Sequence, residues 1–195
     1  PADIEAIIFD CDGTLADTFG AHFRTFRDIL ADYQITFEAE FYQARLGLSR
    51  SQLLQALAET KGSSFDDADV ARRSVEAFFQ HLSSVRAIPY THDILHAYHG
   101  KLKLGVASSG QKALVTATLK TIGVYDLMDT VITIEDARAG KPAPDLYLVA
   151  AGRLGVAPEF VQVYEDSDEG MEAARRAGMA VTDIRSYYQT DPANW

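Results

Sequence analysis

The sequence of 195 residues contains one cysteine, Cys11, and no long apolar run. A single cysteine excludes an internal disulfide and is typical of a reducing compartment. A membrane-spanning helix needs about 20 consecutive apolar residues, and no segment comes close to that length. Residues 1–6 carry neither the basic nor the apolar part of a secretory signal. We therefore expect a cytoplasmic protein that does not bind a membrane.

Positive charge is also scarce. The chain has 18 lysines and arginines against 28 acidic residues, which gives a formal net charge of −10. Lysine and arginine do not cluster anywhere along the sequence, as they would in a nucleic-acid-binding surface, so we expect no nucleic acid as partner. An acidic protein that binds an anion needs a local positive group. A lysine or a metal ion should therefore stand in any anion site.

What the sequence does contain is two kinds of periodicity. Residues 4–9 read as a buried strand, and residues 18–85 show helical spacing that predicts three or four helices, with Phe23, Phe26 and Ile29 on one apolar stripe. After Pro89 strands and helices alternate, which indicates βαβ units and a parallel sheet. The predicted strands cover 102–108, 129–134, 160–166 and 180–184, and the predicted helices cover 111–123, 144–155 and 169–178.

This pattern predicts an α/β fold with a doubly wound parallel sheet and a small all-helical domain inserted after the first strand. The α/β core would comprise residues 1–15 and 87–195, and the helical domain residues 16–86. The tail "SYYQTDPANW" is not periodic, and the sequence does not say whether it docks.

Polar residues gather where the predicted strands end. In an open parallel sheet, ligands bind outside the carboxyl ends of the strands. Four separate segments therefore deliver carboxylates, hydroxyls and an ammonium to the same edge of the sheet, and this convergence is what indicates a functional site. The residues are Asp10 and Asp12, Ser108 and Ser109, Lys141, and Glu165 and Asp166.

Phosphoryl transfer suits this set of side chains. Two neighbouring carboxylates repel each other unless a cation lies between them, and Asp10 and Asp166 offer the hard oxygen ligands that Mg²⁺ takes. An ionised Asp10 is a competent nucleophile, and Asp12 can act as the general acid and base. Ser108 can donate a hydrogen bond to a phosphate oxygen, and Lys141 can balance the charge of both phosphate and carboxylates.

The sequence "DCDGTLADT" at residues 10–18 resembles the first motif of the haloacid dehalogenase-like (HAD) superfamily, in its phosphatase branch. The segments "VASS", "KPAPD" and "YEDSDEG" are similar to the second, third and fourth motifs, in the family's order. The resemblance implies a Rossmann-like core with a type 1 helical cap, within the beta-phosphoglucomutase-like and sugar-phosphate phosphatase group. It departs at Cys11, where the family often has a larger apolar residue, and we expect this thiol to be packed as a small apolar side chain.

The resemblance also implies roles for individual residues. Asp10 would be the nucleophile, Asp12 the acid and base, and Ser108 and Lys141 the phosphate ligands, with Ser109 beside them. Mg²⁺ would be held by Asp10, the carbonyl of Asp12 and Asp166, with Glu165 at or near the metal. In the mutase-like branch a histidine at the place of His22 touches substrate or catalytic groups, and an arginine at the place of Arg50 meets a second anionic group. For both, a solvated position on a helix surface remains an equally ordinary interpretation.

The sequence thus predicts a Mg²⁺-dependent phosphomonoester hydrolase that acts through an aspartyl-phosphate on a small soluble substrate, such as a sugar phosphate or a phosphoglycolate-like acid. The alternative is a phosphosugar mutase of the beta-phosphoglucomutase kind, which shares every core residue. The family resemblance favours a monomer. His92, His96 and His99 have a spacing that metal ligands use, but the sequence shows no fourth ligand nearby, so a solvated helix face is the more ordinary interpretation.

Overall fold

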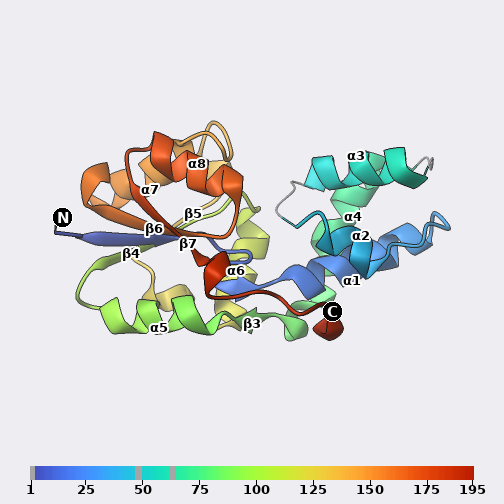
Figure 1. Ribbon diagram of the computed structural model, residues 1–195, viewed down its shortest axis with the longest axis horizontal. Helices are drawn as coiled ribbons and strands as arrows, with labels where there is room; N and C mark the ends of the chain where they lie inside the picture. Colours follow the sequence, from blue (N-terminus) through green and yellow to red (C-terminus); the bar gives the residue numbers. More distant parts are fainter. Residues whose placement is uncertain (1–2, 47–49, 62–64) are drawn as a thin grey trace. The chain divides into compact units, whose positions relative to one another are not determined.

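The computed structural model describes residues 3–46, 50–61 and 65–195. It contains two compact units (Figure 1). The α/β unit comprises Pro1–Asp17 and Arg86–Thr190, and the helical unit comprises Thr18–Val85 and Asp191–Trp195.

The α/β unit is built on a five-stranded sheet in the order β5-β4-β1-β6-β7. Each neighbouring pair is parallel, and the central strand β1 pairs with β4 and β6 along its whole length. The predicted α/β fold with a parallel sheet is confirmed. The strands are β1 (Ala6–Phe9), β4 (Lys103–Ala107), β5 (Thr130–Ile132), β6 (Val161–Glu165) and β7 (Ala180–Asp183).

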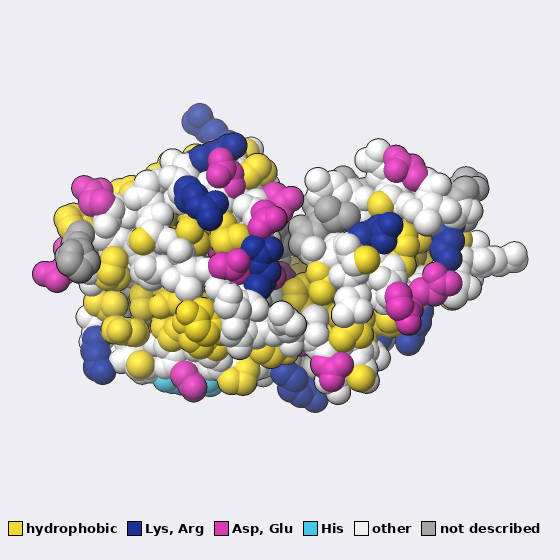
Figure 2. All heavy atoms as spheres, viewed as in Figure 1, with side chains coloured by type: hydrophobic (Ala, Val, Ile, Leu, Met, Phe, Trp, Pro, Cys, Tyr) yellow, Lys and Arg dark blue, Asp and Glu magenta, His cyan; other side chains and the backbone are white. Residues whose placement is uncertain are grey.

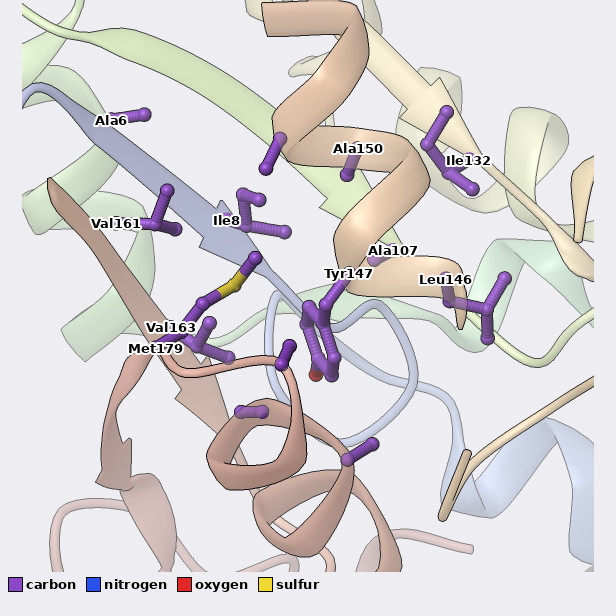
Figure 3. Close-up of a cluster of buried hydrophobic side chains, with 14 residues drawn as sticks. Ala6, Ile8, Ala107, Ile132, Leu146, Tyr147, Ala150, Val161, Val163 and Met179 are labelled. Atoms are coloured by element: carbon purple, nitrogen blue, oxygen red, sulfur yellow. The ribbon is translucent and has the colours of Figure 1, made fainter. Parts of the chain in front are cut away.

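Both faces of this sheet are covered by helices, as in a doubly wound fold. Alternate residues of β1 point to opposite faces, so Ile8 belongs to one buried apolar cluster, and Ile7 and Phe9 belong to another. Figure 3 shows the first cluster, in which Tyr147 and Ala150 of α7 pack over Ile8. The helices α7 (Asp145–Leu154) and α8 (Asp168–Arg176) cover this face, and α5 (Pro89–Tyr98) and α6 (Lys112–Thr121) cover the other.

Two features of the α/β unit were not predicted. The two-residue strands β2 (Ala16–Asp17) and β3 (Arg86–Ala87) pair antiparallel, and strands this short have no periodicity to read. Helix α5 follows directly after β3 and begins with Pro89 in its first turn. Short 3₁₀ helices complete the chain: η1 (Leu82–Ser84), η2 (Tyr125–Leu127), η3 (Ile134–Asp136), η4 (Pro158–Phe160), η5 (Ile184–Ser186) and η6 (Pro192–Asn194).

The helical unit follows β2 in the sequence. The apolar stripe predicted for α1 is confirmed, because Phe23, Phe26 and Ile29 are all buried in one cluster with residues of the other helices. At the start of α4, the carboxylate of Asp66 accepts hydrogen bonds from two backbone N–H groups, as an N-cap should. The helices are α1 (Phe19–Ala31), α2 (Ala39–Gln43), α3 (Arg50–Lys61) and α4 (Asp67–Gln80), and none of the described helices is both long and apolar enough to cross a bilayer.

The last five residues group with the helical unit, whereas the sequence placed them with the α/β core. The reason is Trp195, whose ring centroid lies 5.7 Å from that of Phe23 and 5.3 Å from that of Tyr42. The preceding residues remain in the α/β unit, where the Tyr188 and Thr190 hydroxyls both donate to Asp17 Oδ2, at 2.6 and 2.8 Å. The tail is therefore attached at both ends, although it is not periodic.

Candidate active site

The loop after β1 carries the first part of the site. Asp10 follows the last residue of the strand, and its N–H donates to the Tyr164 carbonyl of β6, so the loop begins beside the end of a second strand. The chain then turns back tightly, with the N–H of Leu15 donating to the Cys11 carbonyl at 3.0 Å. Gly13 has a φ of 82°, in the left-handed region that glycine adopts without strain. The side chain of Asp10 is nevertheless buried, with 7% of its surface exposed.

Lys141 connects the loop after β5 to two carboxylates. Its Nζ lies 2.5 Å from Asp10 Oδ1 and 2.6 Å from Glu165 Oε1, and its side chain is almost fully buried. Burial alone would lower the pKa of this ammonium, but the two carboxylates outweigh it and raise the pKa well above its ordinary value. Lys141 is therefore charged and is held directly against Asp10.

Glu165, at the end of β6, is fully buried and saturated with hydrogen bonds. Its Oε1 accepts from Lys141 and from the Tyr147 hydroxyl at 2.8 Å. Its Oε2 accepts from the N–H groups of Asp166 and Ser167 at 2.9 and 3.0 Å, and from the Ser167 hydroxyl at 2.9 Å. Burial opposes its ionisation, yet Lys141 and these donors hold the pKa of Glu165 below its usual value. Glu165 thus fixes the position of Lys141.

Asp10, Glu165 and Asp166 together form a candidate metal site. Each offers a carboxylate oxygen, and the three oxygens lie within 4.8 Å of one another. Asp166 also accepts a hydrogen bond from the Thr14 hydroxyl at 3.1 Å, which orients its carboxylate. Three carboxylates are hard oxygen ligands of the kind that Mg²⁺ takes. Because the oxygens of Glu165 already accept five hydrogen bonds, Asp10 and Asp166 are the better placed ligands.

The pKa values show that this cluster lacks positive charge. Burial raises the pKa of Asp10 to about 7, although Lys141 opposes the shift. Burial, with the Asp10 and Glu165 carboxylates, also raises the pKa of Asp166 well above its usual range. One ammonium therefore does not compensate three buried carboxylates, and a divalent cation would supply what is missing. The residues present fit a magnesium ion.

This imbalance leads to a prediction about pH. An acid with a raised pKa in the folded state stabilises the fold at low pH, and that contribution is lost as the pH rises from the unfolded pKa of 3.8 through the folded pKa of about 7. With a chelator present, we expect the melting temperature to fall between about pH 5 and pH 8, and Mg²⁺ to reduce that fall because it binds the ionised form. Thermal melts at both pH values, with EDTA and with Mg²⁺, measure this. An identical fall under both conditions would contradict the assignment.

Ser108 and Ser109 follow β4 at the same edge of the sheet. Ser108 is buried and its hydroxyl accepts the Gly110 N–H at 3.0 Å, which leaves the hydroxyl proton available to a ligand. Ser109 is exposed and accepts the Lys141 N–H at 3.4 Å. A Cβ placed on Gly110 would lie 3.1 Å from Ser108 Oγ and 3.6 Å from Asp12 Oδ2, so these two side chains approach the same point.

The remaining predicted residues have different surroundings. Cys11 is fully buried in an apolar cluster, and burial and the nearby acids raise the pKa of its thiol, so its packing as a small apolar side chain is confirmed. His22 lies in the helical unit against Phe78, with ring centroids 4.6 Å apart. Arg50 begins α3, also in the helical unit, and its guanidinium donates to the Ala71 carbonyl at 3.5 Å. Their roles stay predictions.

Two contacts within the site could not be predicted from the sequence. Tyr147 occupies an apolar position of α7 and is buried among aliphatic side chains (Figure 3), yet its hydroxyl reaches Glu165. Thr14 belongs to the first motif, but only the structure shows its bond to Asp166, 152 residues further along the chain. Sequence periodicity reports which face a residue is on and not which polar atom it reaches.

Comparison with known proteins identifies the family of this chain. Residues 7–184 match the haloacid dehalogenase-like hydrolase family. The chain belongs to this family. It is 33% identical over 180 residues to the fructose-1-phosphate phosphatase YqaB of Escherichia coli (strain K12), across 92% of this chain and 95% of that protein. The resemblance that the four motifs indicated is confirmed.

Two further relatives place this HAD-like hydrolase within the family. The beta-phosphoglucomutase of Bacillus subtilis (strain 168) is 28% identical over 185 residues, across 90% of this chain and 81% of that protein. The structure of CbbY from Rhodobacter sphaeroides in complex with xylulose-(1,5)bisphosphate superposes with a TM-score of 0.79 at 26% identity, across 91% of this chain and 84% of that one. The chain is therefore a HAD-like phosphatase of the group that contains beta-phosphoglucomutases, CbbY proteins and sugar-phosphate phosphatases.

Proposed function

We propose that this chain is a Mg²⁺-dependent phosphatase that hydrolyses a small phosphomonoester, a sugar phosphate or a phosphoglycolate-like acid, through an aspartyl-phosphate on Asp10. The observation that carries the proposal is the contact of Asp10 with Lys141 at an edge of the sheet where Asp166 and Ser108 also lie. The names of the curated relatives support a phosphorylated carbohydrate as substrate, because two of them are phosphatases of such compounds.

The first half-reaction transfers the phosphoryl group to the protein. A carboxylate oxygen of Asp10 attacks phosphorus as the bond to the substrate oxygen breaks, and Asp12 donates a proton to that leaving oxygen. Bound Mg²⁺ would supply charge neutralisation for the phosphate and the carboxylates, held by Asp10, the Asp12 carbonyl and Asp166. The Ser108 hydroxyl and the Lys141 ammonium bind the phosphate oxygens. Ser109 follows Ser108 in the loop after β4 and also contacts the phosphate.

The second half-reaction restores the enzyme. Asp12, now ionised, takes a proton from a water molecule whose oxygen attacks phosphorus. The bond between phosphorus and Asp10 breaks, which releases inorganic phosphate and the free carboxylate. Throughout, Glu165 keeps Lys141 in place by the ion pair at 2.6 Å. The helical unit would act as the cap that excludes other water molecules, with His22 near the substrate.

A phosphatase screen tests the proposal. Phosphate release is measured over sugar phosphates, phosphoglycolate and nucleotides, with Asp10→Asn as the blank and EDTA to remove the metal. Turnover that survives EDTA, or that Asp10→Asn retains, would refute the mechanism. We also propose that the enzyme is a monomer, which light scattering checks in the same preparation.

The mutase alternative is decided by the product. A phosphatase releases inorganic phosphate from the sugar phosphate, whereas a mutase returns an isomer. A mutase needs a second phosphate contact in the helical unit, and Arg72 and Arg73 of α4 are two candidate cations for it. Both side chains form ion pairs within that unit, Arg72 with Asp69, and Arg73 with Asp32 and Asp69. These ion pairs make Arg72 and Arg73 poor candidates for that contact, so the product assay decides between the two functions.

Arg50 differs from those two arginines and leads to a prediction about specificity. Among the described residues its guanidinium has only the Ala71 carbonyl as partner, and burial lowers its pKa. A half-buried cation without a carboxylate suits a second anionic group of the substrate. We expect Arg50→Gln to reduce kcat/KM about tenfold for a sugar bisphosphate relative to a sugar monophosphate, a loss typical of one charged hydrogen bond.

Arg72→Gln is the matched control, because the Arg72 side chain is 68% exposed and paired with Asp69. Steady-state kinetics on both substrates give the ratio for each variant. An unchanged ratio in Arg50→Gln would assign Arg50 to the fold of the helical unit instead of to the substrate.

A further inference from the structure

Helix α5 carries a pair of histidines that the phosphatase mechanism does not use. His92 and His96 lie one helical turn apart, and their Nε2 atoms are 3.4 Å from each other. The ring planes meet at 63° with centroids 4.4 Å apart. His92 is half-buried and His96 is exposed, and histidine side chains are visible at the surface where α5 edges the α/β unit (Figures 1 and 2). We propose that this pair is a second metal site, for a transition-metal dication such as Zn²⁺.

The distance between the two nitrogens fits a tetrahedral ion. Zinc binds imidazole nitrogen at about 2.0–2.1 Å with tetrahedral angles, so two such ligands are about 3.3–3.4 Å apart. A direct hydrogen bond between two nitrogens would be shorter, near 3 Å. The observed separation is long for a bond between the rings and equals the spacing of two ligands of one tetrahedral ion.

The helix holds this pair in place. Residues i and i+4 share one face, and α5 is anchored to the α/β core by Leu95, which is fully buried. The Thr91 hydroxyl donates to the Thr14 and Ile88 carbonyls, which fixes the first turn of the helix to the loop after β1. Because the ligands stand on an anchored element, little rearrangement is needed for a metal to bind.

The histidine pair would leave coordination positions of the metal unfilled, and it offers nitrogen ligands where the carboxylate cluster offers oxygen. His99 shares the spacing in the sequence, but its backbone has φ −55° and ψ 129° and no longer follows the helix. Within the part of the chain that the structure describes, no third histidine, cysteine or carboxylate joins the pair within 4.8 Å. Two nitrogen ligands suit zinc and similar ions, whereas Mg²⁺ takes oxygen, so the two sites should select different metals. The remaining positions would hold water or an outside ligand.

Zinc binding tests the proposal independently of phosphatase activity. Zn²⁺ is titrated by calorimetry in excess Mg²⁺, which occupies the carboxylate cluster, and on the Asp10→Asn background, which weakens zinc binding by that cluster. We expect one equivalent to bind, and His92→Gln and His96→Gln each to weaken binding about tenfold or more, as loss of a ligand does. His99→Gln is the matched control and should leave the affinity unchanged. Binding that neither His92→Gln nor His96→Gln weakens, or that His99→Gln weakens equally, would overturn the assignment.

Cobalt supplies a second readout that does not depend on affinity. Co²⁺ in a tetrahedral site absorbs visible light strongly, whereas octahedral Co²⁺ absorbs weakly. The wild-type protein in excess Mg²⁺ should give the strong spectrum, and His96→Gln, at an exposed position that tolerates the change, should lose it. A weak, octahedral spectrum in the wild type would refute the tetrahedral site, even if some cobalt were bound.

Discussion

Replacing Asp10 by asparagine abolishes phosphate release while the protein stays folded. The amide has the size of the carboxylate but cannot form an acyl-phosphate, so we expect a loss of roughly 10⁴-fold or more in kcat. Lys141 keeps its other partner, Glu165, at 2.6 Å. Because burial raises the pKa of Asp10 to about 7, the neutral amide also removes an unfavourable charge at higher pH. The melting temperature in the absence of metal should therefore equal or exceed that of the wild type at about pH 8.

The control for this variant is Asp126→Asn, which removes one charge at an exposed position of η2. It should leave kcat unchanged and should retain the stabilisation by Mg²⁺, which Asp10→Asn should largely lose. Phosphate-release assays give kcat, and thermal melts with and without Mg²⁺ give the stabilisation by the metal. Measurable turnover by Asp10→Asn above the background of the assay would mean that another group is the nucleophile.

Replacing Gly170 by alanine should damage the site although the substitution removes no polar group. Gly170 lies in the first turn of α8, and a Cβ built there would be 1.7 Å from Glu165 Oε1 and 2.0 Å from its carboxyl carbon. Glu165 is fully buried and bound by five donors, so it cannot rotate away without breaking the contacts that hold Lys141. We expect about 3 kcal/mol of destabilisation from the overpacking. A shift of Lys141 by about 1 Å would lower kcat roughly 10²-fold.

Gly152→Ala is the matched control, because Gly152 lies in α7 and a Cβ there meets no atom within 4 Å. Alanine favours a helix over glycine by about 1 kcal/mol, so this variant should be as stable as the wild type or more stable, with full activity. Urea unfolding and steady-state kinetics on the two variants separate a steric effect from helix propensity. A stable and active Gly170→Ala would show that the close approach of α8 to Glu165 is dispensable.

The sequence was most informative about features that repeat or that lie at strand ends. Each predicted strand of the sheet exists, because alternating or continuous apolar residues leave few other structures for those segments. Asp10, Glu165 and Asp166 could be grouped in advance because parallel strands present their carboxyl ends at one edge. On the face shown in Figure 2, blue and magenta side chains are mixed over the described residues, in line with the absence of a basic run in the sequence.

The features that the sequence did not predict depend on single contacts. Tyr147 reads as one more apolar residue of α7, and its role rests on one hydroxyl that meets Glu165. The two-residue strands β2 and β3 are too short to have a period. Arg50 could not be distinguished from Arg72 by sequence, because only the fold decides which of them meets a carboxylate. Such contacts join residues that are distant in the chain, so the local sequence pattern does not predict them.

The place of Trp195 has a consequence for how this protein is made. Its ring packs on Phe23 and Tyr42, so the aromatic core of the helical unit includes a side chain that the ribosome adds after every strand of the sheet. Residues 18–85 emerge before it, and part of their interior stays open until residues 191–195 have been added. A chimaera that exchanges this inserted segment for that of a relative would also have to exchange residues 191–195. Otherwise Trp195 would meet aromatic side chains of another protein in place of Phe23 and Tyr42.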